Sequence, residues 1–125
     1  MALPLALHHV SLDVSDLDRS LAFYSGVLGL EKIPRPDLNV AGVWLGLGAA
    51  EIHLIVRDES YGDIGSSPSS INPAAQHVAL RVDDYTSTVA HLRAAGLEVL
   101  ETNAARGQCW IQDPDGHVLE FIVKR

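Results

Sequence analysis

The second half of this chain repeats the pattern of the first half at an offset of 67 to 68 residues. An offset of 68 places His9 on His77, and an offset of 67 places His53 on Glu120. A drift of one residue is what a duplication followed by one loop deletion would leave. A chance match between two short apolar strand and helix patterns is the alternative. A duplication would require the chain to fold as two copies of one small unit.

Each copy begins and ends with a segment that has the pattern of a β-strand. These four segments span residues 9–14, 51–56, 77–82 and 118–123. In the first and third, valine and leucine alternate with more polar residues, which is typical of strands with one buried face. Turn-forming stretches at residues 44–48 and 113–116 lead into the second and fourth. Residues 58–73 are rich in serine, glycine and proline without periodicity, which indicates a linker between the copies.

A helix is predicted after the first strand of each copy. Ser15 or Asp16 can cap the first helix, and Asp83 or Asp84 can cap the second, which is expected to stop before Gly96. The predicted apolar stripes consist of Leu17, Leu21, Tyr24 and Leu28 in the first helix and of Tyr85, Val89 and Leu92 in the second. Both copies therefore follow the order strand, helix, strands, which predicts the α+β class.

Composition excludes several classes of protein. The 125 residues suffice for one domain or for two small, closely packed halves. A net charge of −7 without a basic cluster argues against nucleic-acid binding. The single cysteine, Cys109, excludes a disulfide framework or a cysteine-based zinc finger, and we expect it to be buried and inert. The apolar start of the chain lacks a basic flank, so we expect neither a signal peptide nor a membrane span, and a cytoplasmic protein.

Four side chains stand at equivalent places in the two copies. His9 and His77 begin the first strand of each copy, while His53 and Glu120 lie in the last strand. Two curved half-sheets that face each other would direct all four into one concavity. Imidazole and carboxylate groups suit a divalent ion such as zinc, nickel, cobalt, manganese or iron, and four ligands leave one or two positions open for water or substrate.

The ordinary alternative is that each histidine is a hydrogen-bonded residue at the edge of a strand. Glu120 is harder to explain in this way, because its neighbours Val118, Leu119, Phe121, Ile122 and Val123 are all apolar. A carboxylate in such surroundings is costly unless it is paired or bound to a metal. The remaining histidines, His8, His91 and His117, have no partner in the repeat.

Several motifs together resemble the vicinal oxygen chelate superfamily, which includes glyoxalase I, bleomycin and fosfomycin resistance proteins, methylmalonyl-CoA epimerase and extradiol dioxygenases. The motifs are residues 7–17, 21–24, 28–30, 76–80 and 113–120. The resemblance implies two paired βαβββ modules, about residues 5–57 and 74–125, which form a curved mixed sheet around a metal-binding cup within one domain. It also implies a homodimer, and its ligand positions fall on His9, His53, His77 and Glu120. Glyoxalase I typically has a glutamate where this chain has His53.

The predicted function is that of a metal-dependent lyase or isomerase that transfers a proton on a small substrate chelated through vicinal oxygens. Glu120 is the candidate for both ligand and proton shuttle. Ser11 shares a strand face with His9 and is a candidate to orient the substrate, although it could simply line the cup. The candidate substrate-binding residues are Arg81, Trp44, Trp110, Arg106 and Arg35. An ion pair with Asp13 is the alternative for Arg81, and packing is the alternative for the tryptophans.

Three other functions remain open. His9, His77 and Glu120 form the two-histidine, one-carboxylate set of an extradiol Fe(II) dioxygenase. A protein of the bleomycin-resistance kind would sequester a drug or metabolite without chemistry. A fosfomycin-type transferase would carry a catalytic threonine where this chain has Ser11. The sequence does not decide whether the metal site forms within one chain or between two, or whether glutathione takes part.

Overall fold

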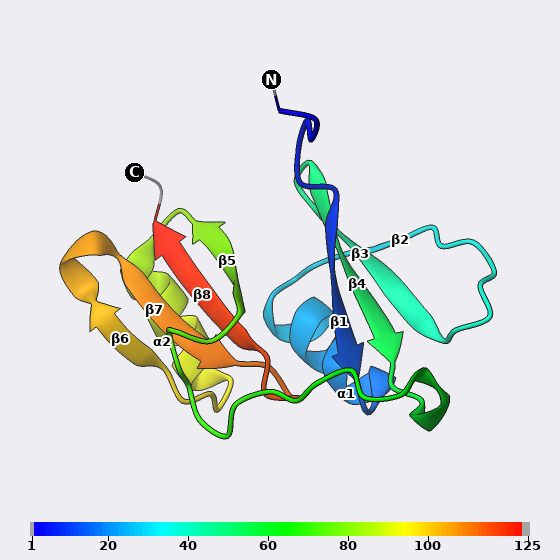
Figure 1. The fold of residues 1–125 in the computed structure, drawn as a ribbon. Helices are drawn as coiled ribbons and strands as arrows, with labels where there is room; N and C mark the ends of the chain where they lie inside the picture. The colour runs from blue at the N-terminus through cyan, green and yellow to red at the C-terminus, as the bar shows by residue number, and fades with distance from the viewer. Residues whose placement is uncertain (1, 124–125) are drawn as a thin grey trace. The chain divides into compact units, whose positions relative to one another are not determined.

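The computed structural model describes residues 2–123 (Figure 1). The chain divides into two compact units, Met1–Ile64 and Gly65–Arg125, which we call the first half and the second half. The boundary falls inside the predicted linker 58–73, where the one regular element is a 3-10 turn at Glu59–Tyr61. Residues 124 and 125, the end of the predicted second repeat, lie outside the described residues.

The first half is a four-stranded mixed sheet with one helix. Its elements are β1 (His9–Val14), α1 (Leu17–Leu21), a π-helical segment (Ala22–Val27), β2 (Lys32–Ile33), β3 (Gly42–Leu47) and β4 (Ala50–Val56). The strand order is β1-β4-β3-β2, with β1 parallel to β4 and the other pairs antiparallel. This half is therefore a βαβββ module.

The second half has the same topology. Its elements are β5 (His77–Val82), α2 (Tyr85–Ala94), β6 (Leu100–Asn103), a 3-10 turn (Ala104–Arg106), β7 (Gln108–Gln112) and β8 (Val118–Val123). The strand order is β5-β8-β7-β6, again with the first and last strands of the module parallel. Two βαβββ modules with one strand order confirm the predicted α+β fold of paired modules.

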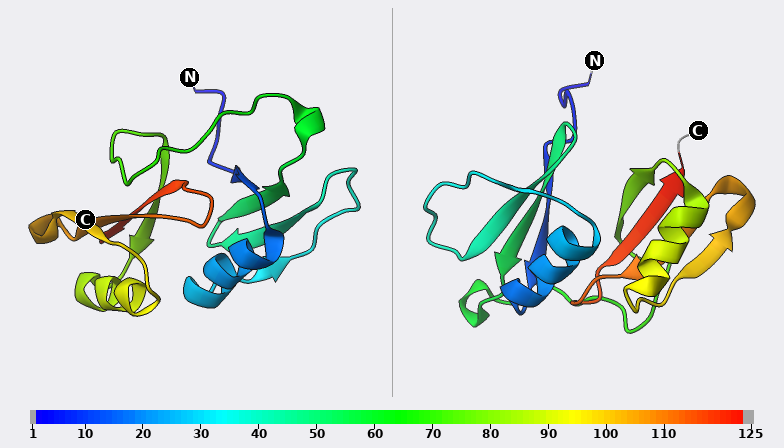
Figure 2. Two further views of the ribbon diagram at one scale, coloured as in Figure 1. Left: turned by 90° about the horizontal axis from the view of Figure 1, so that it is seen from below. Right: turned by 180° about the vertical axis from the view of Figure 1, so that it is seen from behind.

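In each half the helix covers one face of the sheet (Figure 2). The alternation of apolar residues explains which face this is, because Leu12 and Val14 on β1 and Leu80 on β5 point toward the buried side. The core of the two modules consists mainly of Val14, Tyr24, Leu45, Ile52, Leu54, Leu92, Ile111, Val118 and Leu119. The opposite face of each sheet is left to carry the polar residues.

The first helix differs from its prediction. Asp16 caps it, accepting a hydrogen bond from the backbone N–H of Arg19 at 3.1 Å, but α1 has only five residues before the π-helical segment begins. There the N–H of Leu28 donates to the carbonyl of Phe23, five residues back. This wider turn lets the adjacent residues Phe23 and Tyr24 both be buried, whereas Leu28 of the predicted stripe is only partly buried.

The second helix agrees with its prediction. Asp84 is the N-cap and accepts a hydrogen bond from the backbone N–H of Ser87 at 2.8 Å. Hydrogen bonding from the Ser87 side chain, and then from its backbone, holds the pKa of Asp84 below its usual range. Val89 and Leu92 are buried, and Gly96 ends the helix with a φ of 87°. Within residues 2–123 no helix is long and apolar enough to traverse a bilayer.

Candidate metal centre and active site

In the first half, strand register places the predicted ligands on the face opposite the helix. Ser11 of β1 pairs with His53 of β4, and His9 lies two residues before Ser11 on the same face. Trp44 of β3 pairs with His53 from the other side. His53 therefore occupies the middle of a polar and aromatic row that runs across three strands.

The aromatic rings of this row are stacked. The ring centroids of His9 and His53 are 3.9 Å apart with an interplanar angle of 13°, and those of Trp44 and His53 are 4.2 Å apart at 7°. His53 is only 6% exposed, since it is sandwiched between the two rings. His8 contributes a further contact, with its Nδ1 atom 2.8 Å from Nδ1 of His9.

Glu51 is a carboxylate of the first half that the sequence reasoning missed. Its Oε1 atom accepts a hydrogen bond from Nε2 of His53 at 2.8 Å, so in a neutral His53 ring Nδ1 keeps the free lone pair. Its position two residues before His53 on one strand was the available signal. Desolvation, with the nearby His53 and His8, lowers the pKa of His9 below its ordinary value, and Glu51 opposes this shift.

In the second half, Glu120 is buried at the centre of the sheet. It pairs with Ala79 of β5 and with Trp110 of β7, and it is 7% exposed. One oxygen, Oε1, lies 3.3 Å from Nε2 of His77. The other oxygen, Oε2, accepts a hydrogen bond from Nε2 of Gln108 at 2.6 Å. The expectation that a carboxylate within this apolar strand has partners is therefore met.

The tautomer of His77 is set by its backbone contact. Nδ1 of His77 donates to the carbonyl of Ala75 at 2.8 Å, so in a neutral ring Nε2 carries a lone pair. Nε2 lies 3.3 Å from Oε1 of Glu120, which is also an electron-pair donor as a carboxylate. Two such atoms this close repel each other unless the His77 ring takes up a proton or a cation binds beside them.

The two tryptophans stand at the same register position in the two modules. Trp44 pairs with His53, and Trp110 pairs with Glu120. Trp44 is partly exposed and stacks on the His53 ring, whereas Trp110 is buried and meets His77 edge-on with a centroid distance of 4.7 Å. The indole N–H of Trp110 donates to Oγ1 of Thr102 at 2.8 Å. Packing thus accounts for Trp110, while Trp44 presents an exposed edge beside a predicted ligand.

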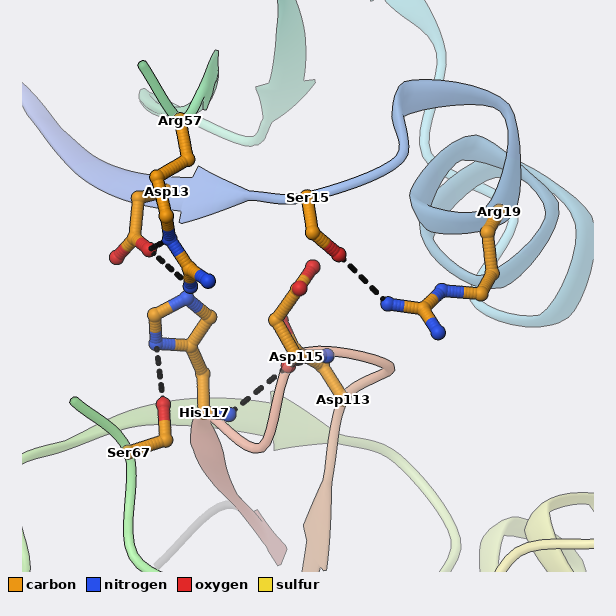
Figure 3. Close-up of polar contacts among 8 residues, drawn as sticks. All are labelled: Asp13, Ser15, Arg19, Arg57, Ser67, Asp113, Asp115 and His117. Atoms are coloured by element: carbon orange, nitrogen blue, oxygen red, sulfur yellow. Dashed lines mark hydrogen bonds and ion pairs between the residues drawn. The ribbon is translucent and has the colours of Figure 1, made fainter. Parts of the chain in front are cut away.

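The three predicted substrate-binding arginines occupy different surroundings. Arg81 is exposed on β5 and shares the face of His77, and Arg106 is exposed in the 3-10 turn before β7. Arg35 donates through Nη2 to the carbonyl of Val40 at 2.7 Å, so it braces the loop between β2 and β3. Asp13, the alternative partner considered for Arg81, forms its ion pair with Arg57 (Figure 3).

The remaining residues set aside on sequence grounds have structural roles. Cys109 is buried, and burial is the main cause that raises the pKa of its thiol to about 11, in keeping with an inert side chain. Oδ1 of Asp113 accepts hydrogen bonds from the backbone N–H groups of Asp115 and His117, each at 2.9 Å, which fixes the turn before β8 (Figure 3).

The donor set fits a divalent metal ion in its chemistry and, in the second half, in its spacing. Metal–nitrogen and metal–oxygen bonds of about 2.0–2.2 Å place adjacent ligand atoms roughly 3 Å apart, and Nε2 of His77 and Oε1 of Glu120 are separated by 3.3 Å. In the first half, the stacked rings of His9 and His53 are nearly parallel, so their nitrogen lone pairs do not converge. One of the rings of His9 and His53 would therefore have to turn for both to bind one ion.

Neither half assembles a complete ligand set by itself. Within residues 2–123, no cluster of three or more histidine, cysteine, aspartate or glutamate side chains is arranged to hold a metal. Each half instead carries one pair: His9 and His53 in the first, His77 and Glu120 in the second. A site with all four predicted ligands therefore needs one first half and one second half.

Comparison with known proteins identifies the family. The sequence model of the Glyoxalase/Bleomycin resistance protein/Dioxygenase superfamily matches residues 6–121, and the chain belongs to this family. It is 33% identical to a lactoylglutathione lyase of Haemophilus influenzae, over 94% of this chain and 91% of that protein. The resemblance to the superfamily expected from the motifs is therefore confirmed.

Solved structures agree with this assignment. A glyoxalase family protein of Bacillus anthracis superimposes with a TM-score of 0.80 at 23% identity, covering 100% of this chain and 99% of that one, which shows the shared fold. A lactoylglutathione lyase of Agrobacterium tumefaciens has a TM-score of 0.70 at 25% identity, covering 98% of this chain and 96% of that one. The lactoylglutathione lyases of Haemophilus and Agrobacterium support an enzyme of the glyoxalase superfamily that is a lyase.

Proposed function

We propose that this protein is a metal-dependent glyoxalase-like enzyme, with His9, His53, His77 and Glu120 as the ligands of one divalent ion. The observation that carries the proposal is the approach of two potential ligand atoms in the second half, Nε2 of His77 and Oε1 of Glu120, to 3.3 Å. The Ala75 contact of His77 leaves its Nε2 atom able to bind a cation, and Glu120 is a buried carboxylate beside it. The bound ion would chelate two vicinal oxygens of the substrate and stabilise the negative charge that develops on them.

Glu120 is the group that we assign to proton transfer. When the substrate displaces it as a ligand, its carboxylate would accept a proton from the carbon beside a substrate carbonyl and return it to the neighbouring position, which is a net isomerisation. Its burial limits the access of water to that proton, since Glu120 is 7% exposed between Trp110 of β7 and Ala79 of β5 in the sheet. Substitution of Glu120 by Gln keeps the shape of the side chain and removes the base, so it separates proton transfer from folding.

Ser11 and Trp44 are the residues of the first half that we assign to the substrate. Ser11 is exposed and adjoins His53 in the strand register, so its hydroxyl is available to a polar group of the substrate. Trp44 is partly exposed and offers an apolar surface beside the same histidine. Arg81, exposed on the face of His77, is the candidate in the second half for holding an anionic group of the substrate.

The names of the relatives indicate the first substrate to test. The Haemophilus and Agrobacterium proteins are lactoylglutathione lyases, so we propose a thiol adduct of this kind as the substrate class. The test measures formation of lactoylglutathione from methylglyoxal and glutathione, using protein stripped of metal and reloaded in turn with zinc, nickel, cobalt, manganese and iron. We expect turnover with at least one metal, none after chelation, and loss of turnover with retained metal in Glu120→Gln. Full activity of stripped protein would refute the proposal.

One contact favours a second function, extradiol cleavage by Fe(II). The hydrogen bond between Nε2 of His53 and Glu51 leaves only Nδ1 of that ring for a metal, and without His53 the ligands His9, His77 and Glu120 are a two-histidine, one-carboxylate set. Oxygen uptake with catechols by the iron-loaded protein would favour this dioxygenase over the lyase. A drug-sequestering protein is the outcome if the carefully purified protein contains no stoichiometric metal.

We also propose that the enzyme is a cytoplasmic homodimer, and the ligand pairs provide a test of how its site is built. A heterodimer of His53→Ala and Glu120→Ala chains keeps one intact set of ligands if each site joins the first half of one chain to the second half of its partner. The same heterodimer has no intact set if each site lies within one chain. Metal affinity of the purified heterodimer decides between these arrangements, because only an intact set of ligands keeps the affinity of the original protein, and sedimentation measures the dimer itself.

A further inference from the structure

We propose that Gln108 is a positioning residue that holds one oxygen of Glu120 and leaves the other oxygen alone to bind the metal. The inference rests on the proposed function, because it assigns a role relative to the same ligand. Nothing in the sequence pattern singles out Gln108. It is a neutral residue at the start of a strand, and its relation to Glu120 depends on the strand register.

The geometry divides the two oxygens of Glu120 between two partners. Gln108 pairs with Ile122, two residues along β8 from Glu120, so both side chains lie on the same face of the sheet. Its Nε2 atom donates to Oε2 of Glu120 at 2.6 Å, while Oε1 lies 3.3 Å from Nε2 of His77. The carboxylate is thus oriented with one oxygen toward the amide and the other toward the predicted ligand.

The backbone at Gln108 is fixed on both sides. The carbonyl of Gly107 accepts a hydrogen bond from the N–H of Val123 at 2.9 Å, and the hydroxyl of Tyr85 donates to the carbonyl of Gln108 at 3.4 Å. Gly107 has a φ of 67°, and a Cβ atom there would come within 2.6 Å of the Val123 side chain. This glycine therefore lets the chain enter β7 close against β8, which brings the amide of Gln108 within reach of Glu120.

The chemical consequence concerns the number of coordination positions. A carboxylate can bind a metal through one oxygen or through both. An N–H group that occupies Oε2 favours binding through Oε1 alone, and this keeps a position free for an oxygen of the substrate. A glutamine is suited to this task because it donates a hydrogen bond without adding a charge that would compete for the metal.

The test uses Co(II), whose visible absorption reports the number of its ligands, in the full-length protein. Gln108→Leu keeps the approximate size of the side chain and removes the donor. We expect weaker visible absorption, because Oε2 joins the coordination sphere, and a metal affinity lower by about 10- to 100-fold in competition with a chelator. Gln112→Leu is the matched control, since Gln112 lies on the same face of β7 and its amide binds the carbonyls of Pro68 and Gly116. The control should retain the spectrum and affinity of the original protein.

The outcomes separate this inference from the proposed function. If the unsubstituted protein binds Co(II), and Gln108→Leu has the same spectrum and affinity, then the role of Gln108 is refuted while the metal site stands. If the unsubstituted protein binds no Co(II), then the proposed function itself fails. If circular dichroism shows that Gln108→Leu is unfolded, the second variant is Gln108→Asn, whose shorter amide withdraws from Oε2. Gln108→Asn is expected to give the same changes in Co(II) absorption and metal affinity. An unchanged Co(II) spectrum of Gln108→Asn refutes the inference.

Discussion

The two halves of this protein share one strand order and one tryptophan position, yet they prepare their predicted ligands in different ways. In the first half His53 is stacked between His9 and Trp44, and its Nε2 atom is bound to Glu51. In the second half His77 and Glu120 face each other at 3.3 Å, with their remaining polar atoms held by Ala75 and Gln108. The sheets determine where the ligands stand, and the neighbouring side chains determine what each ligand is ready to bind.

This difference implies an unequal preparation for metal binding. The second half already holds two potential ligand atoms 3.3 Å apart, so we expect binding there to require little rearrangement. The first half has to turn a stacked ring, and it gives up a favourable aromatic contact in doing so. The second half is therefore expected to dominate the binding energy.

The largest expected effect is the loss of stability on substitution of a core residue, and this loss should be similar in the two halves. Ile52 and Leu119 are related by the offset of 67 residues and are 1% and 0% exposed. Substitution of either by alanine should lower the free energy of unfolding by about 2–5 kcal/mol, because each leaves a cavity in a packed interior. Urea denaturation measures the loss, and hydrogen exchange shows which half is affected. A loss below about 1 kcal/mol at one site would show that its core is loosely packed.

The next effect should distinguish the two ligand pairs. Glu120→Ala is expected to lower metal affinity by at least about 100-fold, and His53→Ala by only about 10-fold, because the second half is the better prepared. Competition with a chromogenic chelator measures both constants. Ser11→Ala, on the face of His53, is the control and should leave metal affinity unchanged. Equal losses for the two ligand variants would contradict the unequal preparation of the halves.

A smaller difference is expected between the equivalent tryptophans. Trp44→Leu removes a stacking contact at a partly exposed site and should destabilise the protein by about 1 kcal/mol. Trp110→Leu removes a buried ring and leaves Thr102 without its donor, which should cost about 2 kcal/mol or more. Thermal or urea denaturation of the metal-free protein compares them. The reverse order would mean that the stacked row of the first half contributes more to stability than burial in the second.

The smallest effect is the response of the metal-free protein to acid. The pKa of His9 in the folded protein lies below the value of 6.5 expected in the unfolded chain, so the unfolded chain binds a proton at a higher pH than the folded protein does. The free energy of unfolding is therefore expected to decrease as the pH falls below about 6.5. The pKa of Glu101 is lowered from 4.5 chiefly by its hydrogen bond from Tyr85, so its stabilisation is present above about pH 4.5 and is lost as the pH falls through the lower folded value.

Hydrogen exchange at a series of pH values should therefore show the first half losing protection before the second. His9→Gln should remove the loss of protection near pH 6.5, and Glu101→Gln should remove part of the loss of protection below pH 4.5. Simultaneous loss of protection in both halves at every pH, unchanged by either substitution, would contradict this assignment.

Much of the fold could be predicted because local patterns determine it. The predicted strands at residues 9–14, 77–82 and 118–123 coincide with β1, β5 and β8, since alternation marks a sheet with one buried face. The cap at Asp84 is also a local feature. The π-helical segment could not be predicted in this way, because no local residue pattern marks where hydrogen bonds to the fifth preceding residue replace those to the fourth. The short edge strands β2 and β6 carry too few residues for a pattern.

In the candidate site, too, local patterns predict some residues and strand pairing determines the others. Glu120 was recognisable because a carboxylate among apolar residues requires a partner, and the structure provides Gln108 and His77. Gln108 itself was not recognisable, since it lies 12 residues from Glu120 along the chain and becomes its neighbour through the pairing of β7 with β8. The stacking of His9 on His53 likewise depends on the pairing of β1 with β4.

Gly107 has a consequence for how this sequence can vary. Gly29 and Gly96 also have positive φ values, but a Cβ atom at either would meet nothing within 4 Å, so asparagine is an acceptable replacement there. At position 107 both the backbone angle and the Val123 side chain oppose any larger residue. In a library of all single substitutions, position 107 should tolerate almost none, and its few survivors should carry a compensating smaller residue at position 123.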